Sequence, residues 1–159
     1  MAIKLTGAVL ITDKLAQMKA FYADVMKLSV EMDFGNCVAF EGGLSLWKLT
    51  EDYPAAKALG STIFDAANKN MEVCFETDEF GEEAARIKQS GAALLHDIET
   101  EKWGQQTIRF YDPDCNLVEL GESMPCFCRR LQSSGMNIAQ VAAHTGIPEQ
   151  GVRAFLGEV

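Results

Sequence analysis

One order of predicted elements occurs twice along this chain and limits the folds that it can adopt. A strand, a helix and three further strands are predicted over residues 1–50 and again over residues 71–122. A Thr-Asp pair suited to start a helix lies at residues 12–13 and, 65 residues later, at residues 77–78. Each unit has one helix, which can cover only one face of its sheet. The repeat therefore predicts two paired βαβββ modules in an α+β fold.

Turn-forming residues and apolar spacing place the elements inside each module. In the first module, residues 4–11 favour a strand, apolar residues then recur at helical spacing, and Gly42-Gly43 predicts a hairpin turn. Its other strands are expected at residues 29–33, 37–41 and 44–50. In the second module, Gly91 ends the predicted helix. The strands of this module are expected at residues 71–76, 92–96, 107–111 and 117–120.

The last part of the chain falls outside both modules and favours helices. Asn137 and Gln140 form a capping-box pattern, Gly146 ends that helix, and Pro148 opens another. The pair resembles a helix-turn-helix, so we expect a C-terminal helical hairpin. The predicted division of the chain is module one at 1–50, a connection at 51–70, module two at 71–122 and a helical extension at 123–159.

The net charge of −9 argues against polyanionic partners. Residues 1–121 hold 11 basic and 20 acidic side chains, whereas residues 122–159 hold three of each. An acidic protein repels nucleic acid and anionic membranes. In the hairpin, the second helix offers only Arg153 to a phosphate backbone and also carries Glu149 and Glu158. We therefore expect the hairpin to dock on its own domain or on a partner chain rather than to bind DNA.

The sequence contains neither a long apolar run nor a signal-peptide pattern. No stretch reaches the length of about 18 apolar residues that a membrane helix needs, and the first residues lack a basic flank followed by an apolar stretch. The five cysteines are scattered and odd in number, which favours reduced thiols over a disulfide framework. These features predict a cytoplasmic protein that binds a small molecule.

A hairpin predicted over residues 103–120 carries a charge where a core residue is expected. Residues 112–116 have turn chemistry, and Glu119 lies between two apolar residues on the second strand. A buried carboxylate needs a partner, so Glu119 is a candidate site residue. Arg109 is a ready partner, because strand alternation places it on the same face as Tyr111.

Several other side chains suit either a ligand site or a structural role. Arg109 can clamp a carboxylate or phosphate, or it can simply balance the nearby glutamates. His96 precedes an acidic loop, where it leans over a cavity mouth or stays on the surface. Trp47 and Trp103 can stack on a flat ligand or pack in the core. Cys74 shares the strand parity of the candidate site but has no activating neighbour in sequence.

Two segments carry a family resemblance. Residues 21–26, FYADVM, and residues 112–120, DPDCNLVEL, together with the paired βαβββ units, resemble the vicinal-oxygen-chelate superfamily. This group includes glyoxalase I, bleomycin-resistance and fosfomycin-resistance proteins, extradiol dioxygenases and methylmalonyl-CoA epimerase. The resemblance covers residues 2–122. It implies a curved mixed sheet with the helices outside, a ligand cavity on the concave face, and a homodimer.

The same resemblance implies metal ligands on the first and last strands of each module. In the second module these positions fall on Glu72 and Glu119. In the first module they fall on Thr6 or Gly7 and near Lys48, none of which suits a metal. With two carboxylates and no imidazole, we expect either no metal or a weakly bound magnesium or manganese ion rather than zinc or nickel. Two carboxylates facing one cavity also suit proton transfer without a metal, so this pair is the candidate catalytic pair.

These observations lead to one main expectation and two alternatives. We expect a glyoxalase-like protein that binds a small organic ligand, through an anionic or hydroxyl group, over a polar floor of Glu72, Glu119 and Arg109 in a depleted metal site. The first alternative is a lyase, isomerase or epimerase that uses a divalent ion on the two glutamates as a Lewis acid. The second is a ligand-responsive regulator that signals through the helical extension. The expected ligand contacts are Arg109, Trp47, Trp103, His96, Tyr111, Cys74 and Lys48.

Overall fold

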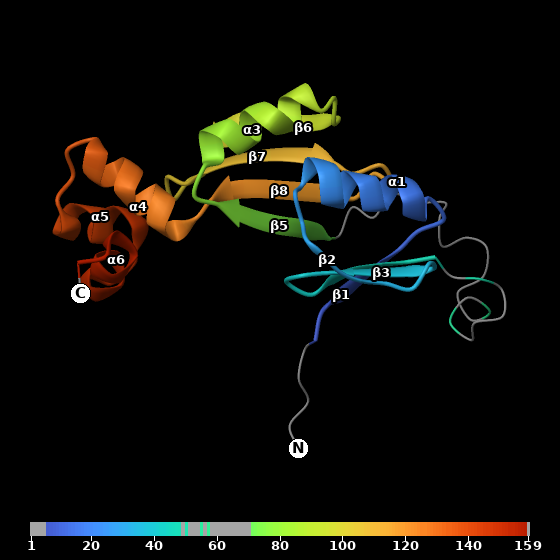
Figure 1. Cartoon of the computed structure of the whole chain (residues 1–159). Helices are drawn as coiled ribbons and strands as arrows, with labels where there is room; N and C mark the ends of the chain where they lie inside the picture. Colours follow the sequence, from blue (N-terminus) through green and yellow to red (C-terminus); the bar gives the residue numbers. More distant parts are fainter. Residues whose placement is uncertain (1–5, 49, 51–54, 56, 58–70, 159) are drawn as a thin grey trace, which may run out of the picture. The chain divides into compact units, whose positions relative to one another are not determined.

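The computed structural model describes residues 6–48, 50, 55, 57 and 71–158 and divides into two compact units (Figure 1). The first unit comprises Met1–Met71 and Asp112–Asn116, and the second comprises Glu72–Tyr111 and Leu117–Val159. The connection that we expect at residues 51–70 lies outside the described residues, apart from positions 55 and 57. The start of the first predicted strand, residues 4 and 5, also lies outside them.

The first unit holds one mixed sheet and the first helical segment. Its elements are β1 (Ala8–Ile11), α1 (Leu15–Ala20), η1 (Phe21–Val25), β2 (Val30–Asp33), β3 (Cys37–Phe40) and β4 (Leu44–Trp47). The strand order is β1-β4-β3-β2, with β1 parallel to β4 and the other pairs antiparallel. Gly42 and Gly43 have φ angles of +91° and +89°, which explains why the β3–β4 turn carries two glycines. The predicted hairpin is confirmed.

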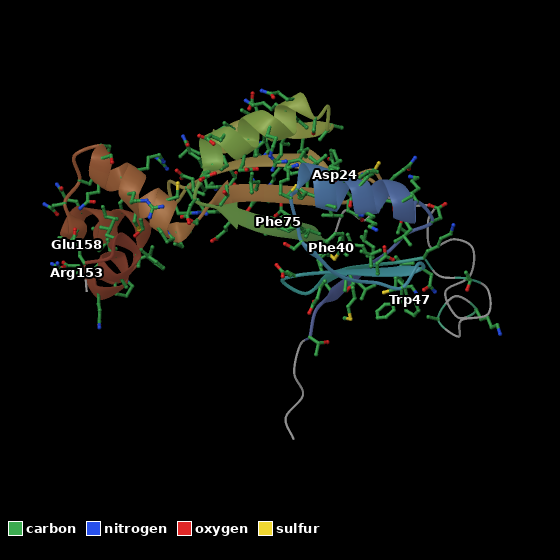
Figure 2. The ribbon with its side chains drawn as sticks, in the orientation of Figure 1. Asp24, Phe40, Trp47, Phe75, Arg153 and Glu158 are labelled. Atoms are coloured by element: carbon green, nitrogen blue, oxygen red, sulfur yellow. The ribbon has the colours of Figure 1, made fainter. Side chains whose placement is uncertain are left out.

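A buried core joins the helical segment to the sheet in this unit. Met18, Tyr22, Phe40 and Leu46 are fully buried. The ring centroids of Tyr22 and Phe40 lie 6.0 Å apart, and Figure 2 shows Phe40 on the sheet. The predicted single helix is continuous, but its second half, η1, is π-helical. Apolar burial on one side of this segment therefore fixes it against the sheet.

The turn Asp112–Asn116 is organised around one buried carboxylate. Asp112 is only 3% exposed, and its oxygens accept hydrogen bonds from the Tyr22 hydroxyl at 2.9 Å and from the Asn116 side-chain amide at 2.9 Å. The backbone N–H groups of Asp114 and Asn116 also donate to Asp112, each at 2.9 Å. Burial, with the nearby Asp112 charge, raises the pKa of Tyr22 well above its usual range. The first aspartate of the DPDCN segment is thus an acceptor that shapes the turn.

The second unit repeats the arrangement of the first. Its elements are β5 (Glu72–Thr77), α3 (Phe80–Gln89), β6 (Leu94–Thr100), β7 (Gln106–Tyr111) and β8 (Leu117–Glu122). The strand order is β5-β8-β7-β6, with β5 parallel to β8 and the other pairs antiparallel. Both orders place the first strand of a module beside its last. The predicted α+β fold of two βαβββ modules is therefore confirmed, each module forming a four-stranded mixed sheet.

Helix α3 covers one face of the second sheet (Figure 1). The buried apolar side chains between them are Phe80, Ala84 and Ile87 on the helix and Ile108, Phe110, Val118 and Leu120 on the strands. Because strand residues alternate between faces, Thr107, Arg109 and Glu119 point to the opposite face. We call this opposite side the polar face of the second sheet.

The two Thr-Asp pairs have a role different from the one that we predicted. The helices begin at Leu15 and Phe80, and neither is capped by a side chain. Instead, the Thr12 hydroxyl accepts a hydrogen bond from the backbone N–H of Lys14 at 2.9 Å, and the Thr77 hydroxyl accepts one from Glu79 at 3.1 Å. Each threonine therefore closes a tight turn between a strand and a helix.

The C-terminal extension has three helices rather than the predicted pair. They are α4 (Met124–Ser133), α5 (Ile138–Thr145) and α6 (Glu149–Leu156). The expected capping box at Asn137 is present, and Gly146 ends α5 in a left-handed conformation. A separate small core joins the three helices and consists of Phe127, Cys128, Leu131, Val141 and Val152. Among the described residues, no helix combines the length and apolar character that crossing a membrane requires.

Loss of a side chain from this small core should destabilise the extension. Leu131 is 5% exposed within the core, so Leu131→Ala should lower the free energy of unfolding by about 2–5 kcal/mol. Ser133, exposed on the same helix, provides a control, since Ser133→Ala should cost less than about 0.5 kcal/mol. Urea denaturation followed by circular dichroism measures both. Equal costs for the two variants would contradict the small core.

Candidate functional site

Strand register aligns four of the predicted site residues in one row across the polar face. Cys74 on β5 is paired with Glu119 on β8, Glu119 with Arg109 on β7, and Arg109 with His96 on β6. Side chains of paired residues point to the same face of a sheet. The row explains why residues far apart in sequence meet here, and Arg109 lies on an inner strand with partners on both sides.

The guanidinium of Arg109 is hydrogen-bonded to three carboxylates. Its Nε donates to Glu72 at 2.7 Å, one Nη donates to Glu101 at 2.6 Å, and the other Nη donates to Glu119. Thr107 also donates from its hydroxyl to Glu101 at 3.1 Å. Each nitrogen of Arg109 therefore has a carboxylate partner, and we call these five residues the Arg109 cluster.

Charge in the Arg109 cluster is unbalanced. Three carboxylates face one guanidinium, which leaves a net charge of −2 when all are ionised. Burial raises the pKa of Glu119; Arg109 opposes this effect, and the charges of Glu72 and Glu101 reinforce it. The hydrogen bond from Arg109 lowers the pKa of Glu101, helped by the one from Thr107. Two carboxyls in one cluster thus have pKa values shifted in opposite directions.

His96 has one nitrogen directed at the cluster. Its Nδ1 lies 2.7 Å from the carbonyl oxygen of Asp97, an acceptor, so Nδ1 carries the hydrogen. Nε2 is then free to accept from Arg109, whose Nη lies 3.3 Å away. His96 therefore lies beside the Arg109 cluster, and its role as a ligand contact stays a prediction.

Cys74, Tyr111 and Trp103 belong to the same unit as the cluster. Cys74 is an exposed residue whose sulfur is partly desolvated. This desolvation, together with the charges of Glu119 and Glu72, raises the pKa of the thiol. A protonated thiol is a poor nucleophile. Tyr111 is half-buried at the end of β7, and Trp103, 48% exposed, donates its indole N–H to Gln105 at 2.9 Å. Trp103 is thus available as an exposed aromatic surface.

Trp47 and Lys48 belong to the first unit. Trp47 is half-buried on β4 beside Ile11 and Cys37, and Figure 2 labels it on that sheet. Lys48 is exposed and lines an open depression of about 640 Å³ with Lys14 and Lys19 among its other lining residues. This depression is a feature of the first unit, whereas the Arg109 cluster is built entirely within the second.

Sequence reasoning missed Glu101 as a site residue. We expected the second strand of the module to end at His96, but β6 continues to Thr100. The register of the longer strand pairs Glu99 with Thr107, which brings Glu101 to the same end of the sheet as Arg109. The alternation of charged residues beyond His96 was the only signal for a longer edge strand.

The carboxylates of Glu72 and Glu119 already have a cationic partner, which decides whether a divalent ion suits this site. Glu72 and Glu119, which the family resemblance led us to expect as metal ligands, are both occupied by the Arg109 guanidinium. Within the part of the chain that the structure describes, no three His, Cys, Asp or Glu side chains converge closely enough to hold a metal ion. A divalent ion between the two glutamates would meet a fixed positive charge, so these residues do not fit a resident metal as they stand.

The chain is similar to known proteins in both sequence and structure. Residues 5–125 match the family described as the glyoxalase-like domain. A protein of unknown function from Agrobacterium tumefaciens str. C58 has a similar structure, with a TM-score of 0.65 and 28% identity over 78% of this chain and 97% of that one. A lactoylglutathione lyase from Agrobacterium tumefaciens gives a TM-score of 0.58 and 26% identity, covering 77% of this chain and 96% of that one.

A more distant structure supports the fold alone. The fosfomycin resistance protein of Listeria monocytogenes has a TM-score of 0.58 and 20% identity, covering 78% of this chain and 96% of that one. None of the curated protein sequences matches the chain. The family match ends at residue 125, so most of the helical extension lies outside it.

The opposite pKa shifts predict different costs for neutralising two glutamates. Glu101 has a lowered pKa, so its ionised form stabilises the fold above the usual carboxyl pKa, and this contribution disappears as pH falls through the lowered value. Glu101→Gln should therefore lower the free energy of unfolding by about 1–3 kcal/mol at neutral pH and by less near pH 4. Glu119 has a raised pKa, so stability falls as pH rises from the usual to the raised value. Glu119→Gln should cost less than Glu101→Gln at neutral pH, as measured by urea denaturation; the reverse order would contradict the assignment.

Proposed function

Because the chain belongs to the glyoxalase-like domain family, within the vicinal-oxygen-chelate superfamily, we propose that it binds a small organic ligand on the polar face of its second sheet. The observation that carries this proposal is the Arg109 cluster, which lies where the family resemblance leads one to expect the reacting end of a ligand. Partly buried charges are costly to keep, and they cluster at sites of function.

The charge of the cluster favours a ligand that donates hydrogen bonds. The three carboxylates around Arg109 leave the cluster with a net charge of −2, so an anionic group is repelled unless it displaces one of them. Carboxylate oxygens have further lone pairs that accept from a hydroxyl or an amine. The sequence led us to consider an anionic group or a hydroxyl group on the ligand. We propose the hydroxyl rather than the anion, and an ammonium group suits the cluster for the same reason.

The proposed site works without a metal ion. Arg109 supplies the positive charge that keeps Glu72 and Glu119 together, as a divalent ion would in a metal-dependent relative. The alternative, a metal-dependent lyase or isomerase, draws support from the similarity to a lactoylglutathione lyase. In that alternative the ion would supply Lewis acidity, and Arg109 would have to leave both glutamates. A half-buried carboxyl with a raised pKa, such as Glu119, is also suited to proton transfer with no metal.

We also propose a cytoplasmic homodimer. The thiols of Cys37, Cys74, Cys115, Cys126 and Cys128 are free. Reduced cysteines are typical of the cytoplasm.

The edge strands β2 and β6 expose large apolar side chains, including Met32 at 47% and Leu95 at 50%. Exposed edges of this kind favour a second chain as partner, and sedimentation equilibrium tests this directly.

Nucleic acid is a poor partner for the helical extension. Its three arginines are ion-paired: Arg129 with Asp78, Arg130 with Glu122 and Arg153 with Glu158, the last pair lying on the outer side of the helices in Figure 2. Paired arginines offer little attraction to phosphates. The regulator alternative therefore depends on contacts of the extension with its own unit.

A thermal-shift titration separates the metal-free proposal from its alternative. Magnesium, manganese, nickel and zinc should shift the melting temperature of the native protein no more than that of Glu119→Gln, because the Arg109 guanidinium already occupies both glutamates. Elemental analysis of the purified protein provides an independent control. A metal that stabilises the native protein by several degrees and leaves Glu119→Gln unchanged would overturn the proposal.

A matched pair of probes tests the charge preference. Propylamine and propionate each have three carbons and carry opposite charges at neutral pH, and NMR of the glutamate carboxyl carbons reports their binding. Propylamine should perturb Glu72 and Glu119 at lower concentration than propionate does. Glu101→Gln should narrow this difference, because it removes one negative charge and leaves an Arg109 nitrogen without a charged acceptor. A preference for propionate in the native protein would contradict the proposed ligand class.

A further inference from the structure

The helical extension is anchored to the second sheet by an ion pair whose carboxylate is buried. Glu122, at the end of β8, is 2% exposed. Its two carboxylate oxygens accept from Arg130 of α4 at 2.6 and 2.9 Å, and one of them also accepts from the backbone N–H of Gln106 at 2.9 Å. The hydrogen bond to Glu122 raises the pKa of Arg130. This ion pair therefore connects α4 with the strands that carry the Arg109 cluster.

The same helix also holds the turn between β6 and β7. The carbonyl oxygen of Gly104 accepts from Arg130 at 2.6 Å. A Cβ atom at Gly104, whose φ is +98°, would come within 2.6 Å of Nε2 of His144 on α5 and 3.2 Å of the Phe127 ring. The side chain of Gln105, 8% exposed, donates to the carbonyl oxygen of Glu122 at 2.6 Å. Close packing and hydrogen bonds thus fix this turn against α4 and α5.

The other end of this turn is Glu101, a member of the Arg109 cluster. The N–H of Glu101 donates to the carbonyl of Gln105, and the N–H of Gly104 donates to the carbonyl of Glu101, both at 2.8 Å. These two bonds make the turn a short, closed unit, so a shift of Gly104 is passed to Glu101. The Glu101 carboxylate lies 2.6 Å from the Arg109 guanidinium.

We propose that the helical extension controls the site by holding Glu101 on Arg109. With the turn clamped, Glu101 occupies one nitrogen of Arg109 and keeps the cluster at a net charge of −2. With the turn released, that nitrogen and the Thr107 hydroxyl become available to a carboxylate on a ligand. Glu101 thus competes with an anionic ligand for Arg109. Arg130 is a positioning residue that acts through the turn. This regulatory role rests on the proposed ligand site.

Two variants release the turn, one by a change in α4 and the other by a change in the turn itself. Arg130→Met removes the bonds from α4, and Gly104→Ala forces the turn away from His144. Arg129→Met is the matched control, because Arg129 lies on the same helix but pairs with Asp78, and its side chain is 51% exposed. The measurement is a carbon-13 NMR titration of the Glu101 carboxyl, with amide hydrogen exchange at residues 101–106. Neither measurement requires a ligand.

Both releasing variants should change Glu101 in the same direction. The pKa of Glu101 should rise toward its usual value, and amide exchange in the turn should become at least about tenfold faster, while Arg129→Met matches the native protein. An unchanged Glu101 pKa in both releasing variants would overturn the proposal. If Arg130→Met unfolds the helices, visible as lost circular dichroism, the pKa of Glu101 should still rise; a pKa that stays low would then overturn it equally.

The propylamine and propionate probes separate this inference from the proposed ligand site. If release of the turn alters Glu101 and also shifts the preference toward propionate, as Glu101→Gln should, both proposals are supported. If Glu101 responds but neither probe binds the native protein, the link between the extension and Glu101 stands while the ligand site fails. If the probes bind as expected and the releasing variants leave their preference unchanged, the ligand site stands and control by the extension is refuted.

Discussion

The position of one guanidinium governs the second unit of this protein. Glu72, Glu101 and Glu119 come from β5, the turn after β6, and β8, and without a cation their charges would repel across a partly buried face. Arg109 lies on β7, between these elements, and binds all three. The arrangement costs desolvation, and it is retained only because each nitrogen of the guanidinium meets an acceptor. The charge balance of the cluster, its ligand preference and its link to the extension all follow from this single side chain.

Much of the fold was predictable because it depends on local patterns that occur twice. Apolar alternation, the glycine pair after β3 and the glycine at the end of α3 each specify a local geometry with little competition from the rest of the chain. Part of the site was predictable for the same reason. Alternation along β7 puts Arg109 on the face opposite the core, and Glu119 stands out as a charge on a strand that otherwise suits burial.

The remaining features depend on register and on contacts between distant segments. Glu101 was missed because β6 is an edge strand with little apolar alternation, so its length is fixed by pairing with β7. The extension was expected to be helical, but α4 was not delimited, although Ser123 caps it and Pro125 lies in its first turn. The threonines before α1 and α3 were assigned as helix caps, since Thr-Asp suits both a cap and a turn, and only the backbone geometry distinguishes them. Trp47 and Lys48 lie in the first unit, so the site that they were expected to share with Arg109 stays a prediction.

The buried carboxylate of Asp112 limits how this chain can be dissected. The turn that contains Asp112 belongs to the first unit, although the strands that it connects belong to the second. Its hydroxyl partner, Tyr22, lies 90 residues earlier in the chain. A fragment that begins after the connection would retain the whole second sheet but lose that hydroxyl, which leaves a carboxylate to be solvated in some other way. The two modules repeat one order of elements, yet a hydroxyl from the first helical segment completes a turn between strands of the second module.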